Sequence, residues 1–102
     1  MGNIHHIFPK SYLRANHFSK NEINQLANYV WLTRPRNMDI SDMAPKDYLH
    51  DETINKYFSS DNNAENAIPE DLQNYDFHDY GPFLEQRRQL MSKKIQQYYQ
   101  QL

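Results

Sequence analysis

The chain has 102 residues, no cysteine and a formal charge of −2, with 38% hydrophobic and 24% charged residues. This composition is typical of a soluble globular protein, and the length predicts a single domain. Without cysteine the sequence provides neither disulfides nor a thiolate zinc site, and its longest apolar run is far too short to span a membrane. The sequence does not start with a charged leader followed by a long apolar segment, so we expect a cytoplasmic protein.

The charge is distributed unevenly along the chain. Residues 1–36 contain five basic residues and one acidic residue, a formal charge of +4, whereas the remainder carries −6. A basic segment of this kind either contacts phosphate groups or is ordinary solvated surface. The first interpretation assigns DNA contacts to Lys10, Arg14, Lys20, Arg34 and Arg36.

The first third of the sequence predicts two strands and a helix. Polar and apolar residues alternate loosely over 3–8, and Pro9 ends this pattern. The pattern predicts a short strand that leads into a loop. The letters SKNE at 19–22 form a capping-box pattern for a short helix whose apolar face is Ile23, Leu26 and Ala27. The letters YVWLT at 29–33 predict a second strand, whose Tyr29 and Trp31 suit either the core or base stacking.

The middle of the sequence predicts short helices and a loop. Residues 37–41 are compatible with a short helical segment, and Pro45 opens a helix that runs through Leu49. Residues 52–58 continue helically, and the polar letters SSDNNAEN at 59–66 predict an exposed loop.

The last third predicts a long amphipathic helix. Pro69 and Pro82 are each expected at a first helical position. Apolar residues then recur at steps of three and four, which predicts a helix with a core-facing stripe. The stripe consists of Phe83, Leu84, Leu90, Met91, Ile95, Tyr98, Tyr99 and Leu102. We therefore expect an α+β domain with a core at 1–49 and a helical buttress at 50–102.

The letters NIHHIFPK at 3–10 place two histidines side by side in the first predicted strand. Neighbouring strand residues point to opposite faces, so His5 and His6 are not expected to hold one ion together. They are either a structural pair or two residues with different tasks, one at a metal and the other at a reacting phosphate. The remaining histidines are interpreted as structural or surface residues: His17, His50 and His78.

Three stretches carry a resemblance to a known family: HHIFPKS at 5–11, ANYVWLTRPRN at 27–37 and APKDYL at 44–49. This part of the chain resembles the ββα-metal (His-Me finger, HNH) nucleases, and within them the C-terminal nuclease domain of GmrSD-type restriction endonucleases. The resemblance continues more loosely through IPEDL at 68–72 and FLEQRRQLMSKKI at 83–95. It implies an α+β fold with a ββα-metal core of two short strands and a mostly helical flank.

The resemblance also implies roles for four residues. It places His5 and Asn37 as the two protein ligands of one divalent metal ion, and His6 as the general base. Asn28 corresponds to the central asparagine of the catalytic site, whose side chain pins the loop between the strands. Asn28 is expected to hydrogen-bond the loop backbone in both directions.

The metal and the DNA contacts remain partly open. With His5 in place of an acidic ligand, imidazole suits Zn²⁺, Mn²⁺ or Ni²⁺ better than Mg²⁺. Asp39 is either a carboxylate for the same ion or exposed surface. Ser11, Arg34 and Arg36 lie close enough in sequence to the expected site to contact DNA phosphates.

The predicted function is therefore metal-dependent hydrolysis of DNA phosphodiester bonds by a restriction-type endonuclease. Because similar domains carry further helices before the first strand and an N-terminal nucleotide-binding region, we expect a C-terminal fragment that works with a missing N-terminal region or a partner subunit. Two alternatives stay open: a non-catalytic nucleic-acid-binding or protein-interaction module that keeps the fold, and a helical scaffold with a structural histidine-bound metal.

Overall fold

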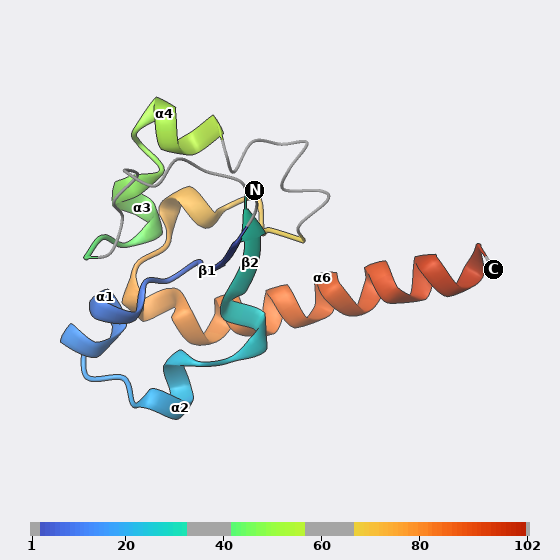
Figure 1. The fold of residues 1–102 in the computed structure, drawn as a ribbon, viewed down its shortest axis with the longest axis horizontal. Helices are drawn as coiled ribbons and strands as arrows, with labels where there is room; N and C mark the ends of the chain where they lie inside the picture. The colour runs from blue at the N-terminus through green and yellow to red at the C-terminus, as the bar shows by residue number, and fades with distance from the viewer. Residues whose placement is uncertain (1–2, 33–41, 57–66, 102) are drawn as a thin grey trace.

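The computed structural model describes residues 3–32, 42–56 and 67–101, which form a small α+β protein with two antiparallel strands and mostly helical content. Strands β1 (Asn3–His6) and β2 (Tyr29–Leu32) pair with Asn3 opposite Leu32 and His6 opposite Tyr29 (Figure 1). Both strands begin where the sequence predicts them, but β1 ends at His6 and not at the predicted Phe8. The helices are α1 (Lys10–Ala15), α2 (Lys20–Ile23), η1 (Leu26–Asn28), α3 (Pro45–Tyr48), α4 (Glu52–Asn55), η3 (Leu72–Asn74), η4 (Phe77–Asp79) and α6 (Tyr80–Gln100).

A short loop at residues 7–9 follows the first strand and leads into a helix that the sequence did not predict. Pro9 is the N-cap of α1, with φ −60°, and its carbonyl accepts a hydrogen bond from the Leu13 amide at 3.0 Å. Proline is tolerated here because the first residues of a helix need no amide donor. The expected loop is therefore short, and the helix α1 that follows it was not predicted.

The α1 helix ends in a Schellman motif. His17 has φ 70°, its amide donates to the Arg14 carbonyl, and the Phe18 amide donates to the Leu13 carbonyl, both at 3.1 Å. Glycine usually occupies this left-handed position because it lacks a Cβ. His17 thus has a backbone role in reversing the chain toward α2.

The capping box of α2 is confirmed. Glu22 N donates to Ser19 Oγ at 3.2 Å, and Ser19 N donates to Glu22 Oε1 at 2.8 Å. The helix ends at Ile23, however, and Leu26 is 72% exposed in the separate η1 turn. The expectation that Leu26 belongs to the buried face was wrong, because a one-turn helix cannot carry its apolar pattern to Leu26.

The core joins both ends of the described chain. The ring of Phe8, two residues after β1, lies 5.1 Å from the Tyr80 ring and 4.8 Å from the Phe83 ring of α6, measured between centroids. The same hydrophobic cluster includes Leu13 of α1 and Tyr48 of α3. The predicted core segment and helical buttress thus share one core.

Prolines open only one of the three helices predicted for them. Pro45 is the first residue of α3, as expected. Pro69 precedes a turn in which its carbonyl accepts from the Leu72 amide at 3.2 Å. Pro82 is the third residue of α6, which begins at Tyr80. Proline fits either place, because neither a turn nor the first helical turn requires its missing N–H.

Only the first half of α6 packs against the core. Phe83 and Leu84 are buried, whereas Ile95, Tyr98 and Tyr99 are 56%, 62% and 67% exposed. Figure 1 shows the C-terminal half of the helix extending away from the other described elements. The expectation that the whole stripe is core was wrong for this half. In the described part of the chain, no helix combines the length and apolar character needed to cross a membrane.

Candidate functional site

The two adjacent histidines of β1 lie on different faces of the strand pair. His5 is paired with Val30, which is 3% exposed, and His6 is paired with Tyr29. Directly paired residues share a face, and neighbours along a strand alternate. His6 therefore shares the more open face with Ile4, which is 66% exposed. The expected separation of the histidines agrees with this register.

The His6 ring is held between two neighbours. Its Nε2 atom lies 3.2 Å from Asn24 Oδ1, and its ring meets the Tyr29 ring edge-on with centroids 4.7 Å apart. Because an amide oxygen only accepts, this hydrogen bond assigns the proton to Nε2 and leaves Nδ1 as an acceptor. Partial burial lowers the pKa of His6 below its usual value, the Asn24 bond opposes this, and the Lys10 charge adds to it. The arrangement favours a neutral imidazole.

Asn28, the last residue of η1, is fully buried and binds the chain after β1. Its Oδ1 accepts from Phe8 N at 2.8 Å, and its Nδ2 donates to Phe8 O at 3.0 Å and Ile23 O at 3.3 Å. Its backbone carbonyl accepts from Ile7 N at 2.8 Å. The expectation that this side chain hydrogen-bonds loop backbone in both directions is confirmed.

Tyr48 completes the hydrogen bonding of this segment. Its buried hydroxyl donates to Ile7 O at 2.7 Å. Together with Asn28, it provides a partner for every backbone N–H and C=O group of Ile7 and Phe8. Buried backbone groups are costly when unpaired, so this network fixes the two residues that follow His6.

Arg87 of α6 hydrogen-bonds the backbone of the two residues that flank Asn28. Its Nη1 atom donates to Ala27 O at 2.8 Å and also to Tyr29 O, the carbonyls on either side of Asn28. Its Nε atom donates to Ala67 O at 3.1 Å. Burial lowers the pKa of Arg87 to about 10, which still leaves a cation at neutral pH.

Sequence reasoning missed Tyr48 and Arg87. A signal existed for Arg87, because it lies three residues from both Leu84 and Leu90, on the apolar stripe of the helix. A charged residue on a core-facing stripe predicts a buried polar contact. Tyr48 has no comparable local signal. Its position in the helix that starts at Pro45 is typical of a core residue and does not indicate a hydrogen bond to Ile7.

Four of the predicted DNA-binding residues lie on exposed positions of the first two helices. Lys10, Ser11 and Arg14 belong to α1 and Lys20 begins α2. Lys10 and Arg14 are four residues apart, so they share a helix face. Lys10 is also near enough to His6 for its charge to depress the pKa of that imidazole.

The remaining predicted site residues lie outside the described residues. These are Arg34, Arg36 and the second metal ligand, Asn37, together with Asp39 and the helical segment expected at 37–41. Of the two predicted metal ligands, the structure therefore describes only His5, which is partly exposed. Among residues 3–32, 42–56 and 67–101, no group of three or more His, Cys, Asp and Glu side chains is placed to hold a metal. The donor set of an imidazole and an amide oxygen suits a borderline divalent ion.

The other histidines lie away from β1 in the sequence and are exposed, as expected. His17 forms the turn after α1, and His50 follows α3. His78 Nδ1 lies 3.2 Å from Asp76 Oδ1 at the start of η4. Tyr29, which suited either the core or base stacking, is half-buried against His6.

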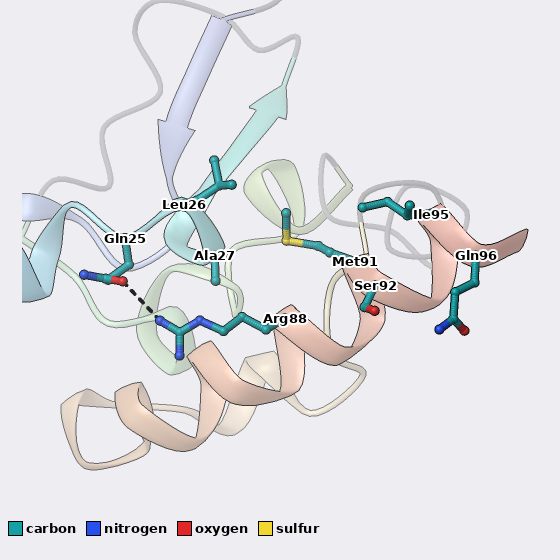
Figure 2. Close-up of a pocket in the computed structure, with 8 residues that line it drawn as sticks. All are labelled: Gln25, Leu26, Ala27, Arg88, Met91, Ser92, Ile95 and Gln96. Atoms are coloured by element: carbon teal, nitrogen blue, oxygen red, sulfur yellow. Dashed lines mark hydrogen bonds between the residues drawn. The ribbon is translucent and has the colours of Figure 1, made fainter. Parts of the chain in front are cut away.

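A groove lies between η1 and α6 (Figure 2). Its volume is about 340 Å³, and its wall is mostly apolar. In Figure 2, Arg88 reaches across its end to Gln25, with Nη2 donating to Oε1 at 3.1 Å. The lining residues are Gln25, Leu26, Ala27, Arg88, Met91, Ser92, Ile95 and Gln96. None of them is a predicted catalytic, metal or DNA-binding residue.

No protein-family model, curated protein or solved structure matches the chain. Function is therefore inferred from the residues and their geometry.

Proposed function

We propose that the chain is a metal-dependent DNA endonuclease domain with a ββα-metal (HNH) core, of the restriction type. The observation that carries the proposal is the double hydrogen bond between Asn28 and Phe8, which fixes the chain two residues after His6. An asparagine that clamps the loop beside a histidine is the arrangement that the sequence resemblance implies.

His6 acts as the general base in this proposal. With Nε2 bound to Asn24, the Nδ1 lone pair accepts the proton of the attacking water. A neutral imidazole is competent for this step near neutral pH, and its usual pKa is about 6.5. A positioned base of this kind contributes about 10²–10⁴-fold to the rate.

His5 and Asn37 are the proposed protein ligands of one divalent ion, which supplies positive charge beside the scissile phosphate when it is bound. The two faces of β1 then separate metal binding at His5 from proton transfer at His6. Neutral ligands favour Mn²⁺, Ni²⁺ or Zn²⁺ over Mg²⁺.

DNA is the proposed substrate, and the basic side chains of residues 1–36 bind its phosphates. Lys10, Arg14 and Lys20 present exposed cations, and Ser11 adds a hydroxyl donor. Arg34 and Arg36 complete the proposed set. An N-terminal region or a partner subunit of a restriction enzyme, in the cytoplasm, is the proposed context.

A second candidate is a nucleic-acid-binding or protein-interaction module that keeps this fold without cleaving. The exposed apolar residues of α6 favour it, since Ile95 lines the groove of Figure 2 and Tyr98 is exposed three residues further along the helix. Exposed apolar surface of this kind is typical of partner binding.

Nicking of supercoiled plasmid in Mg²⁺, Mn²⁺, Ni²⁺ or Zn²⁺ tests the proposal. The wild-type chain should cleave with at least one ion, and His6→Ala should lose about 10²–10⁴-fold in single-turnover rate while keeping its Mn²⁺ affinity in calorimetry. His5→Ala should lose both metal binding and cleavage. His50→Ala is the control, because His50 is exposed and lies after α3.

Two outcomes contradict the proposal in different ways. DNA binding without cleavage in every metal supports the non-catalytic module. Normal cleavage by both His5→Ala and His6→Ala removes the proposed site.

A further inference from the structure

We propose that Arg87 is a positioning residue that holds Asn28, and through Asn28 the backbone beside His6, in one orientation. The catalytic part of this inference rests on the proposed function. The geometric part stands on the contacts of Arg87 alone.

Arg87 binds the chain on both sides of Asn28. Its side chain enters the core, where the residue is 4% exposed, and one nitrogen donates to the carbonyls of Ala27 and Tyr29. A peptide plane is rigid, so holding the carbonyls of Ala27 and Tyr29 fixes the peptide plane before Asn28 and the one after Tyr29, which limits rotation about the Cα atoms of both residues. The direction of the Asn28 side chain is thereby set from α6.

A third contact fixes the guanidinium itself. Arg87 Nε donates to Ala67 O at 3.1 Å, and Ala67 has φ 57°, a conformation unusual for a residue other than glycine. The planar fork presents its donors in fixed directions, which the single ammonium of lysine does not reproduce. The shape of arginine, as well as its charge, is therefore needed here.

The effect reaches His6 in two steps. Asn28 bonds both backbone groups of Phe8 and, through its carbonyl, the amide of Ile7. Ile7 directly follows His6 in the chain. A shift of Asn28 therefore moves the end of β1 that carries the proposed base.

Arg88 provides a matched control. It is the next residue of α6, it carries the same charge, and it contacts the same segment through Gln25 Oε1 at 3.1 Å (Figure 2). Its side chain is 49% exposed, and that contact is to a side chain and not to the backbone around Asn28.

Hydrogen exchange of the Asn28 side-chain amide, followed by NMR in the full chain, tests the geometric part. In Arg87→Met, protection of the Asn28 Nδ2 protons should fall at least about tenfold more than protection of the core Leu13 amide. Arg87→Lys should lie between this variant and wild type, and Arg88→Met should stay within about twofold of wild type. If Arg87→Met does not fold, the same comparison is decided on Arg87→Lys.

Steady-state cleavage of DNA in Mn²⁺ tests the catalytic part. The kcat of Arg87→Met should fall about ten- to hundredfold, with KM for DNA within about twofold of wild type. Arg88→Met should keep the wild-type kcat. Arg87→Lys should recover part of the loss.

The outcomes separate the two proposals. Parallel loss of protection at Asn28 and Leu13 shows a merely structural role for Arg87 and overturns the inference, as does an equal effect of Arg88→Met. An unchanged kcat in Arg87→Met, with an active wild-type chain, overturns its catalytic part. If the wild-type chain does not cleave but the Asn28 protons respond as expected, the proposed function fails and the geometric inference stands.

Discussion

The hydroxyl of Tyr48 donates a hydrogen bond of 2.7 Å to the carbonyl of Ile7, across 41 positions of the sequence. Both residues are fully buried, so no solvent competes for this bond. The contact ties α3 to the residue that follows His6.

Tyr48→Phe should lower the free energy of unfolding by about 1–3 kcal/mol, because it leaves a buried carbonyl without its donor. Urea denaturation measures the change. Tyr75→Phe is the control, since the Tyr75 hydroxyl bonds Gln86 Oε1 at an exposed position and should contribute less. Equal losses in the two variants would contradict a special cost of the buried bond.

Asn28→Ala should slow cleavage through geometry while Mn²⁺ affinity stays near that of wild type. The substitution removes the partners of both Phe8 backbone groups and should also lower stability by about 3 kcal/mol or more. Calorimetry and cleavage are therefore measured at low temperature, where the variant is folded. Loss of metal binding as complete as in Asn37→Ala would mean that the two asparagines have exchanged roles.

DNA affinity should fall with salt at a slope of about −0.9 in log–log form for each phosphate contact. When Lys10, Arg14 and Lys20 are all replaced by glutamine, the magnitude of the slope should therefore fall by about three times this value. The matched variant replaces three cations of α6 with glutamine: Arg88, Lys93 and Lys94. If the slope falls equally in both variants, DNA binds to positive charge in general and not specifically to the cations of α1 and α2.

His17→Gly should raise the free energy of unfolding by about 0.5–1 kcal/mol, because glycine adopts a φ of 70° without steric conflict. Thermal or urea unfolding measures the gain. His50→Gly makes the same chemical change at another exposed position and should not stabilise the protein. Destabilisation by His17→Gly would contradict strain at this turn.

Acid should weaken the start of η4 through Asp76. The backbone amide of His78, at 2.9 Å, and the Lys46 ammonium, at 3.2 Å, hold the pKa of Asp76 below its usual value of 3.8. A lowered folded-state pKa means stability that is present above the unfolded value and lost as the pH falls through the folded value. Wild type should therefore lose more stability than Asp76→Asn as the pH falls below about 3.8.

Lys46→Met separates the two causes. The amide of His78 is the larger one, and the Lys46 pair is partly exposed, so this variant should retain most of the acid dependence. Acid dependence as weak as that of Asp76→Asn would assign the effect to the ion pair.

Local patterns predicted the parts of the fold that depend on neighbouring residues. The Ser19–Glu22 capping box, Pro45 at the start of α3 and the positions of the two strands each depend on a few adjacent side chains. The hydrogen bonds of Asn28 were predictable because the resemblance assigned this asparagine to the loop between the strands.

Long-range contacts account for what the sequence did not predict. Arg87 meets Ala27 across 60 positions and Tyr29 across 58, and no local pattern indicates which carbonyls lie opposite a buried guanidinium. Helical periodicity likewise continues through Ile95 and Tyr98 although the described core ends before them. A repeating apolar pattern predicts a face, but not whether another element covers that face.

The hydrogen bonds from Arg87 of α6 to the carbonyls of Ala27 and Tyr29 have a consequence for the order in which the site forms during synthesis. The strand that carries His5 and His6 leaves the ribosome well before Arg87. Until then the carbonyls beside Asn28 lack their guanidinium, and Phe8 lacks the rings of Tyr80 and Phe83. A nascent chain that stops before residue 87 therefore contains His5, His6 and Asn28 but not the contacts that hold them, so the proposed site is completed only after α6 has been made.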